Sequence, residues 1–504
     1  MTTWTLSRVR ASGEAYLREL GRARLAQLSG RAGASPGEIR EAYRHELGRG
    51  AIDLALEHAE TASPDSADAR SGRALLAWLV ELDVQDVRAP IDQWLADWAE
   101  RATVRTPDAR VVAYLSVDRE IARESDRSMR LQLDGARVDL LKRDVAPTVI
   151  ERSARERDAI ERLDIASSLR EVAERLTGDD LAALADGARQ ALAQSVDSWR
   201  DSLRDRLRRD MAVPVAEARP ADVAAATDAS LFDGAFRASD REATCRRAVT
   251  DLGLDPELHG RLQIEKFARV QGSRAEAVAV DVPAAIHLVF GEHGGVDGQR
   301  AALHALGEAL RLAHVEADAP FEHRWLGDDG VLQMCGRVLA SVLLDEGWLM
   351  RYAELSRTEA RRLARITALG ALHELRHACA LHLHYIESID AAMAVGAHEE
   401  LYAEIVGNAI GVRPHGVDVL LDAPPVLAPG ARLRGMQGAS VLAHELVQRF
   451  DVDWYRNPGA GLWLAQAVFV LARGETTAEM IKAATGRELS LAPFIDRLER
   501  ILAA

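Results

Sequence analysis

Cysteine and aromatic residues are scarce in this chain of 504 residues, of which only 5% are Phe, Trp or Tyr. The three cysteines, Cys245, Cys335 and Cys379, lie far apart and form no C-x-x-C pair. This pattern argues against a disulfide framework and favours buried, reduced thiols in a cytoplasmic protein. A signal peptide is unexpected, because the first 20 residues lack an apolar segment. A membrane span is unexpected too, because no uninterrupted apolar run reaches about 20 residues.

Positive charge is in deficit, since 63 Lys and Arg face 78 Asp and Glu and the formal net charge is −15. An acidic chain is poorly suited to a nucleic-acid groove or to an anionic membrane surface, so neither partner is expected. The sequence also contains no P-loop and no dinucleotide-binding glycine pattern. Ala, Leu, Arg and Glu are abundant instead, and these residues predict a mainly α protein.

The hydrophobic pattern divides the chain into two predicted helical domains. Amphipathic helices with charged outer faces follow one another through residues 1–210, and the pattern then relaxes. Residues 211–504 form the second predicted domain, which is also helical but interrupted by two strands. No internal repeat or low-complexity tract suggests any other organisation.

The second domain carries the predicted strands and a predicted long loop. Residues 276–282 and 285–290 are rich in β-branched and apolar residues, and they predict a small hairpin within 276–290. A helix is expected from about Gln299, after a glycine-rich loop. Prolines and glycines at 422–435 predict a break between later helices.

The pentapeptide HELRH matches the H-E-x-x-H motif of zinc peptidases. In that interpretation His373 and His377 would bind zinc, Glu374 would be the general base, and Glu400 would supply the third ligand. Arg376 argues against it, because a permanent cation inside the motif would be repelled by a divalent metal. The surrounding stretch is rich in histidine and has an apolar stripe at helical spacing, so a structural helix is the favoured interpretation.

A different set of motifs, in a fixed order, lies on both sides of that helix. It comprises Arg274-Ala275, the predicted hairpin, Gly294-Gly295-Val296-Asp297 with Arg300, APFEHRWLGDD at 319–329 and DWYRNPGAGLWL at 453–464. In this order the motifs resemble the thimet-oligopeptidase and oligoendopeptidase F group of zinc peptidases, particularly its bacterial relatives. The resemblance implies a large, helical, clam-shaped zincin-like fold with the hairpin beside the active-site helix.

Aligned with that family, the chain retains one zinc ligand and lacks the rest of the catalytic set. His304 falls on the first histidine ligand. Ala305 stands at the position of the general base, and Glu308 at that of the second histidine. Gln333 falls on the third ligand, a glutamate in the family. Ala428 and Arg432 fall on the two tyrosines that steady the tetrahedral intermediate. In the same register HELRH falls on a helix that merely packs behind the cleft.

The resemblance therefore predicts a catalytically inactive peptidase relative with no bound metal. Its inherited cleft, near His304, Glu308, Gln333 and Arg432, would bind a peptide, a small ligand or a partner protein. A further possibility is that the protein regulates an active paralogue by pairing with it. One alternative is a metal-free enzyme that uses His304, Glu308 and Arg432 for acid–base or anion chemistry. The other is an active zinc peptidase that uses HELRH.

Overall fold

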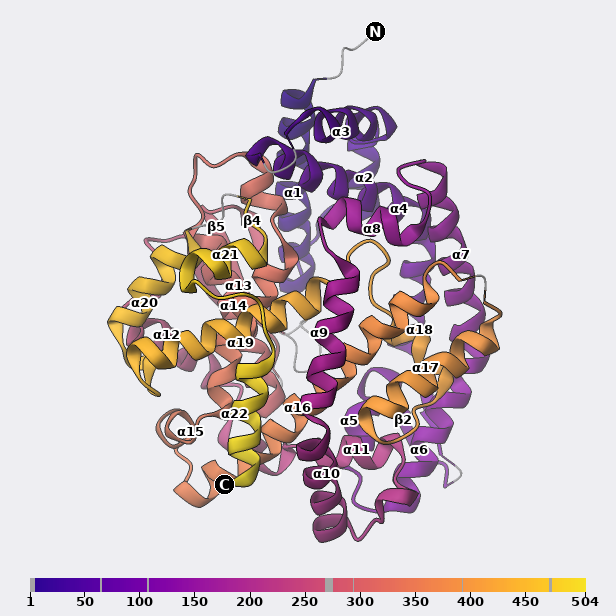
Figure 1. The fold of residues 1–504 in the computed structure, drawn as a ribbon, viewed down its shortest axis with the longest axis vertical. Coiled ribbons are helices and arrows are strands. Elements are labelled where there is room, and N and C mark those ends of the chain that lie inside the picture. The colour runs from indigo at the N-terminus through magenta and orange to yellow at the C-terminus, as the bar shows by residue number, and fades with distance from the viewer. Residues whose placement is uncertain are drawn as a thin grey trace. The chain divides into compact units, whose positions relative to one another are not determined.

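The computed structural model describes residues 5–63, 66–106, 108–267, 275–292, 294–391, 393–470 and 474–504. It is mainly α-helical, as the composition predicts (Figure 1). Among the described residues, no helix combines the length and the apolar character that a membrane crossing requires. Arg274, part of the first family motif, lies outside the described residues.

The chain forms two compact units, each assembled from separate stretches of sequence. The first unit comprises Met1–Leu82, Leu231–Ala364 and Ala431–Phe494, and the second comprises Asp83–Ser230, Arg365–Gly430 and Ile495–Ala504. Neither unit is a contiguous half of the chain. The predicted boundary at residue 210 concerned contiguous domains, and it stays a prediction.

The first unit contains one three-stranded sheet and most of the helices that matter for the site. Its elements are α1 (Leu6–Ser29), α2 (Pro36–Tyr43), α3 (Arg49–Thr61), the start of α4 (Ala67–Arg101), α12 (Arg241–Asp251), β3 (Leu262–Lys266), β4 (Ala275–Asp281), β5 (Ala285–Phe290), α13 (Val296–His314), α14 (Asp329–Ala340), α15 (Glu346–Tyr352), α19 (Ala431–Phe450), α20 (Pro458–Leu464) and α21 (Thr477–Thr485).

The second unit is helical apart from one short strand pair. Its elements are the end of α4, β1 (Thr103–Arg105), β2 (Val111–Ala113), α5 (Val117–Arg123), α6 (Arg127–Leu140), α7 (Ala146–Arg162), α8 (Leu169–Thr177), α9 (Leu181–Gln194), α10 (Val196–Met211), α11 (Pro220–Thr227), most of α16 (Arg357–Ser388), α17 (Val395–Ile410), α18 (Val419–Asp422) and most of α22 (Ala492–Ala503).

The predicted hairpin is confirmed, and it belongs to a larger sheet than expected. Strands β4 and β5 pair antiparallel, with Val278 opposite His287. Strand β3 then pairs parallel to β5 in the order β3-β5-β4. The sequence analysis missed β3, because only Leu262 and Ile264 mark it as half-buried and polar residues surround them. Its partner supplies the missing stability through backbone hydrogen bonds.

The helix boundaries around the site differ slightly from the predicted ones. Helix α13 begins at Val296, after Gly295 with a φ of 95°, which is three residues earlier than expected. A left-handed φ of this kind favours glycine. The predicted loop at 422–435 is confirmed for residues 423–430, but α19 already begins at Ala431. Arg432 therefore lies in the first helical turn.

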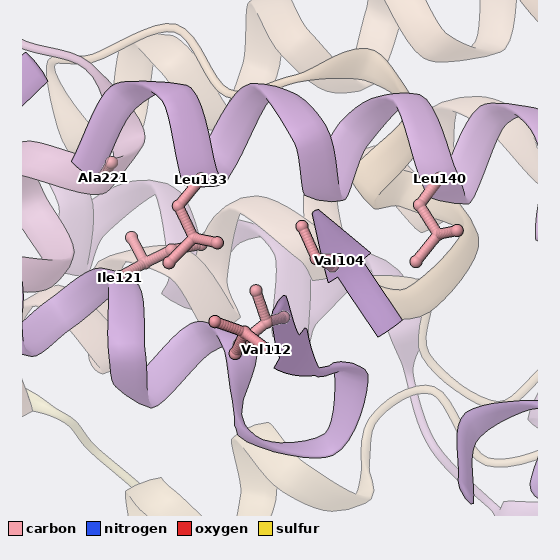
Figure 2. Packing of buried hydrophobic residues seen from close by; sticks show 7 residues of the cluster. Val104, Val112, Ile121, Leu133, Leu140 and Ala221 are labelled. Carbon is pink, nitrogen blue, oxygen red and sulfur yellow. The ribbon is translucent and has the colours of Figure 1, made fainter. Parts of the chain in front are cut away.

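One hydrophobic cluster of the second unit shows how its short strands are retained. Figure 2 shows Leu133 and Leu140 from α6 pointing toward Val104 of β1 and Val112 of β2, with Ile121 of α5 alongside. All five side chains are at most 7% exposed. Two three-residue strands are too short to be stable alone, so this apolar packing holds them.

Candidate functional site

Three helices of the first unit, α13, α14 and α19, lie side by side and carry most of the residues identified in the sequence (Figure 1). Their close approach depends on glycine. A Cβ atom on Gly307 of α13 would overlap the backbone carbonyl of Cys335 in α14. A Cβ on Gly435 of α19 would lie 2.5 Å from Cβ of Gln333 in α14. The sequence thus permits the backbones to pack more closely than ordinary side chains would allow.

His304 lies in this contact and is paired with Glu308. Nε2 of His304 is 3.2 Å from Oε1 of Glu308, one turn later on α13. The imidazole rests on Gly336 of α14, where an added Cβ would be 2.7 Å from the ring. Both side chains keep about a quarter of their surface exposed, 26% and 22%. Ala305, the expected general-base position, is 2% exposed and is part of the core.

Two adjacent aspartates at the start of α14, Asp328 and Asp329, have pKa values shifted in opposite directions. Neither was predicted as a site residue from the sequence. The Asp328 carboxylate accepts hydrogen bonds from Gly330 N, Thr477 N and Thr477 Oγ1 at 2.7–2.8 Å. It also pairs with Nη2 of Arg434 at 2.7 Å. Burial would raise its pKa, but the Arg434 charge and these hydrogen bonds outweigh burial and hold the pKa below its usual range.

Asp329 is exposed and has no such partners among the described residues. Partial loss of hydration raises the pKa of its carboxyl to about 6, and the negative charges of Asp328, Glu81 and Glu308 add to the shift. Its contact with solvent limits the effect. Asp329, Glu308 and His304 thus form a group of titratable side chains at the junction of α13 and α14. The dipeptide Asp328-Asp329 was the available sequence signal.

The remaining aligned positions do not all belong to this group. Gln333 is half-buried on α14, in contact with Gly435. Arg432 is exposed in the first turn of α19. Ala428 lies in the loop before α19 and belongs to the second unit, whereas the other positions belong to the first. Its predicted role beside Arg432 stays a prediction.

The HELRH stretch lies in the second unit, on α16. The rings of His373 and His377 stack with centroids 5.9 Å apart, and the His373 ring also packs on Trp199 at 5.5 Å. Nε2 of His377 is 3.2 Å from Oδ2 of Asp422, so this imidazole has a carboxylate partner. Glu374 between them is half-buried. Both imidazoles are therefore part of the packing of α16.

Arg376 and Glu400 explain why this stretch is a structural helix. Arg376 is 2% exposed and donates to the carbonyls of Ala409 and Leu192 at 2.7 and 2.8 Å and to Ser195 Oγ at 2.7 Å. It thereby satisfies carbonyls near the C-terminal ends of α9 and α17. Glu400, the expected third ligand, is exposed and pairs with Arg413.

Neither place offers the donor set of a catalytic zinc site. Such a site has three protein ligands, and a general base beside them. On α13 the imidazole at the expected ligand position, His304, is already paired with the Glu308 carboxylate. Across the described part of the chain, no three His, Cys, Asp or Glu side chains converge as a metal site would require.

Comparison with known proteins identifies the fold but no family. The sequence matches no family model, and no curated protein matches it. The carboxypeptidase of Pyrococcus furiosus is 10% identical with a TM-score of 0.61, and 99% of each chain is covered. The M32 carboxypeptidase of Deinococcus radiodurans R1 (13% identity, TM-score 0.58) and metallocarboxypeptidase 1 of Trypanosoma cruzi (12%, 0.59) also match over 99% of both chains. The chain has the helical metallocarboxypeptidase fold.

This finding confirms the predicted fold class, a large and mainly helical metallopeptidase-like architecture. Similarity at this level of identity concerns the fold alone. The finer resemblance to thimet oligopeptidase and oligoendopeptidase F stays a prediction, as does the loss of catalysis. The chemistry has to be inferred from the side chains of this chain.

Proposed function

We propose that this protein is a non-catalytic member of the helical metallopeptidase architecture that binds a peptide at the α13–α14 junction. The observation that supports this most directly is the pair formed by His304 and Glu308. Where a zinc peptidase needs two imidazoles and a free carboxylate base, this helix has an imidazole and a carboxylate that satisfy each other. Ala305 is buried and has no group that could take a proton from water.

The same pair is suited to binding. His304 and Glu308 remain partly exposed, and Asp329 adds a carboxyl in the first turn of α14. Imidazole, carboxylate and amide groups can hydrogen-bond the backbone of an extended peptide. The acidic group favours peptides with a positive charge near the bound segment.

The test measures binding and cleavage on the same purified chain. Fluorescence anisotropy with labelled, unstructured peptides of about ten residues should show saturable binding, and mass spectrometry should show no cleavage. Replacing both His304 and Glu308 by Ala should weaken binding at least about tenfold, since even one charge-assisted hydrogen bond contributes about 1.5–3 kcal/mol when well formed. The matched control replaces the other histidine pair, His373 and His377, by Ala and should leave affinity unchanged.

Two results would overturn the proposal. The first is chelator-sensitive cleavage that Glu374→Ala abolishes, which would establish HELRH as a working site. The second is peptide binding that is absent, or that is indifferent to the loss of His304 and Glu308.

A second candidate function rests on Asp329. A carboxyl with a pKa near 6 is typical of groups that exchange protons near neutral pH, and Asp329 is close enough to Glu308 for the two charges to interact. It adds a titratable group to the metal-free alternative, in which His304, Glu308 and Arg432 would act on a bound ligand, with Asp329 as a further proton donor or acceptor. Turnover of a ligand that Asp329→Asn abolishes without loss of binding would favour this candidate over a binding protein.

A further inference from the structure

Arg311 of α13 is a buried cation without a partner. The residue is 6% exposed, and its Nε and Nη1 groups make no hydrogen bond within the described part of the chain. No carboxylate of the described residues lies within ion-pair distance of it. Outside those residues the sequence contains only one further carboxylate side chain, that of Asp65. Arg311 thus lies in the core with two donor groups that have no acceptor among the described residues, which is costly for a buried guanidinium.

The groups that surround Arg311 do not supply that anion. Cys335 faces it from α14, but burial raises the pKa of this thiol to about 12, so the sulfur is neutral near pH 7. Glu475, just before α21, is close enough to influence the charge of Arg311, yet no ion pair joins them. Burial and the positive charge of Arg311 both lower the pKa of His314, which lies one turn later on α13.

The second unit contains a buried arginine that makes the contrast clear. Arg376 is also almost fully buried, and its Nε and Nη1 groups donate to two backbone carbonyls and one hydroxyl. Burial lowers the pKa of both arginines to about 10, so both stay charged at neutral pH. The same two groups, Nε and Nη1, therefore have acceptors in Arg376 and none in Arg311 among the described residues.

We propose that Arg311 is the receptor for a small oxyanion, a carboxylate or phosphate group, bound inside the first unit. Free N–H groups on a permanently charged, poorly hydrated guanidinium are the donors that such groups bind best. Solvent reaches α13 within one turn of Arg311, because Glu308 is 22% exposed. This anion site is independent of the proposed peptide function.

The test compares the thermal unfolding of the full chain with that of Arg311→Met, in a buffer without small oxyanions. Sodium acetate, sodium phosphate or sodium chloride is then added at equal ionic strength. Acetate, phosphate or both should raise the melting temperature of the parent saturably, whereas chloride and Arg311→Met should show no such response. A response to acetate alone identifies a carboxylate ligand, and a response to phosphate alone identifies a phosphate ester.

Arg311→Met should be at least as stable as the parent without oxyanion, because it removes an unpaired buried charge while keeping the side-chain volume. A large loss of stability that Glu475→Gln reproduces would overturn the proposal, since it would show that Glu475 is the partner. So would an acetate or phosphate response that survives in Arg311→Met. If that variant does not fold, calorimetric titration of phosphate and of acetate into the parent decides. Saturable one-to-one binding supports the site, and no saturable binding of either anion overturns it.

Discussion

Replacing Asp328 by Asn should destabilise the protein far more than the same change at Asp329. The Asp328 carboxylate accepts three hydrogen bonds and pairs with the buried guanidinium of Arg434 at 2.7 Å. An amide there would keep one acceptor oxygen, place an NH2 group against other donors, and leave Arg434 without its charge partner. Breaking a buried ion pair by removing one member costs about 3–5 kcal/mol. We expect a loss of this size for Asp328→Asn.

Asp329→Asn is the matched control, since it removes the same charge from the next residue. Asp329 is exposed and makes no ion pair among the described residues, and its raised pKa means that its ionised form is disfavoured in the folded chain. A neutral amide should therefore change stability by less than about 1 kcal/mol, in the stabilising direction, once solvent screening is taken into account.

The two effects should also depend on pH in opposite ways. The folded-state pKa of Asp328 is lowered, so its stabilising contribution is present above the unfolded pKa and is lost as pH falls through the folded value. Asp328→Asn should thus cost most near pH 7 and least in acid. The folded-state pKa of Asp329 is raised to about 6, so its penalty develops as pH rises from about 4 to 6. The small gain from Asp329→Asn should appear only over that range and above.

Urea unfolding of the full chain at about pH 2.5, pH 4 and pH 7, followed by circular dichroism, measures both effects. The lowest pH is needed because the Asp328 contribution persists until the pH falls through its lowered folded-state pKa. The chain has two compact units, so separate transitions are fitted separately. Equal losses for the two variants at pH 7 would refute the reasoning, because they would show that the contacts of Asp328 contribute nothing beyond its charge.

Two further predictions concern the metal site. Replacing Ala305 by Glu, Glu308 by His and Gln333 by Glu should produce a chain that binds about one zinc by elemental analysis, where the parent binds little. The triple variant would have the three ligands and the base of a zinc peptidase. A folded variant that binds no more zinc than the parent would show that the family register through 304–333 is wrong. Replacing His373 and His377 together by Ala should lower stability by only about 1–2 kcal/mol, because the variant loses the ring stacking and one contact with Asp422. A collapse of the melting temperature that zinc reverses would contradict this prediction.

Local patterns were sufficient to predict the mainly helical class and the β4–β5 hairpin, and the spacing of His304 and Glu308 is enough to account for their pairing. Each depends on residues within a few positions of one another, such as the i,i+4 spacing on α13. The Asp328 contacts were beyond that range, because Arg434 and Thr477 lie 106 and 149 residues further along the chain. Strand β3 was missed for a similar reason, since its pairing with β5 stabilises a segment whose own pattern is weak.

The HELRH stretch shows how far a motif can be interpreted without its surroundings. Its spacing does bring His373 and His377 together, as any pair four residues apart on a helix would be. The deciding residue is Arg376, whose side chain satisfies the carbonyls of Ala409 and Leu192 on other helices. The sequence raised one objection to a zinc site, a cation inside the motif, but the carbonyl acceptors of that cation became apparent only in the fold.

The packing around α13 and α14 does not depend on the chemistry of a metal site. The contact between these helices is set by Gly307 against the Cys335 carbonyl and by His304 against Gly336. The start of α14 is fixed to α19 and α21 through Asp328. None of these contacts requires a bound metal, so the packing that positions the helices holds whether or not the chain binds one. A junction held in this way keeps its partly exposed polar groups in place, and those groups are what the proposed peptide binding requires.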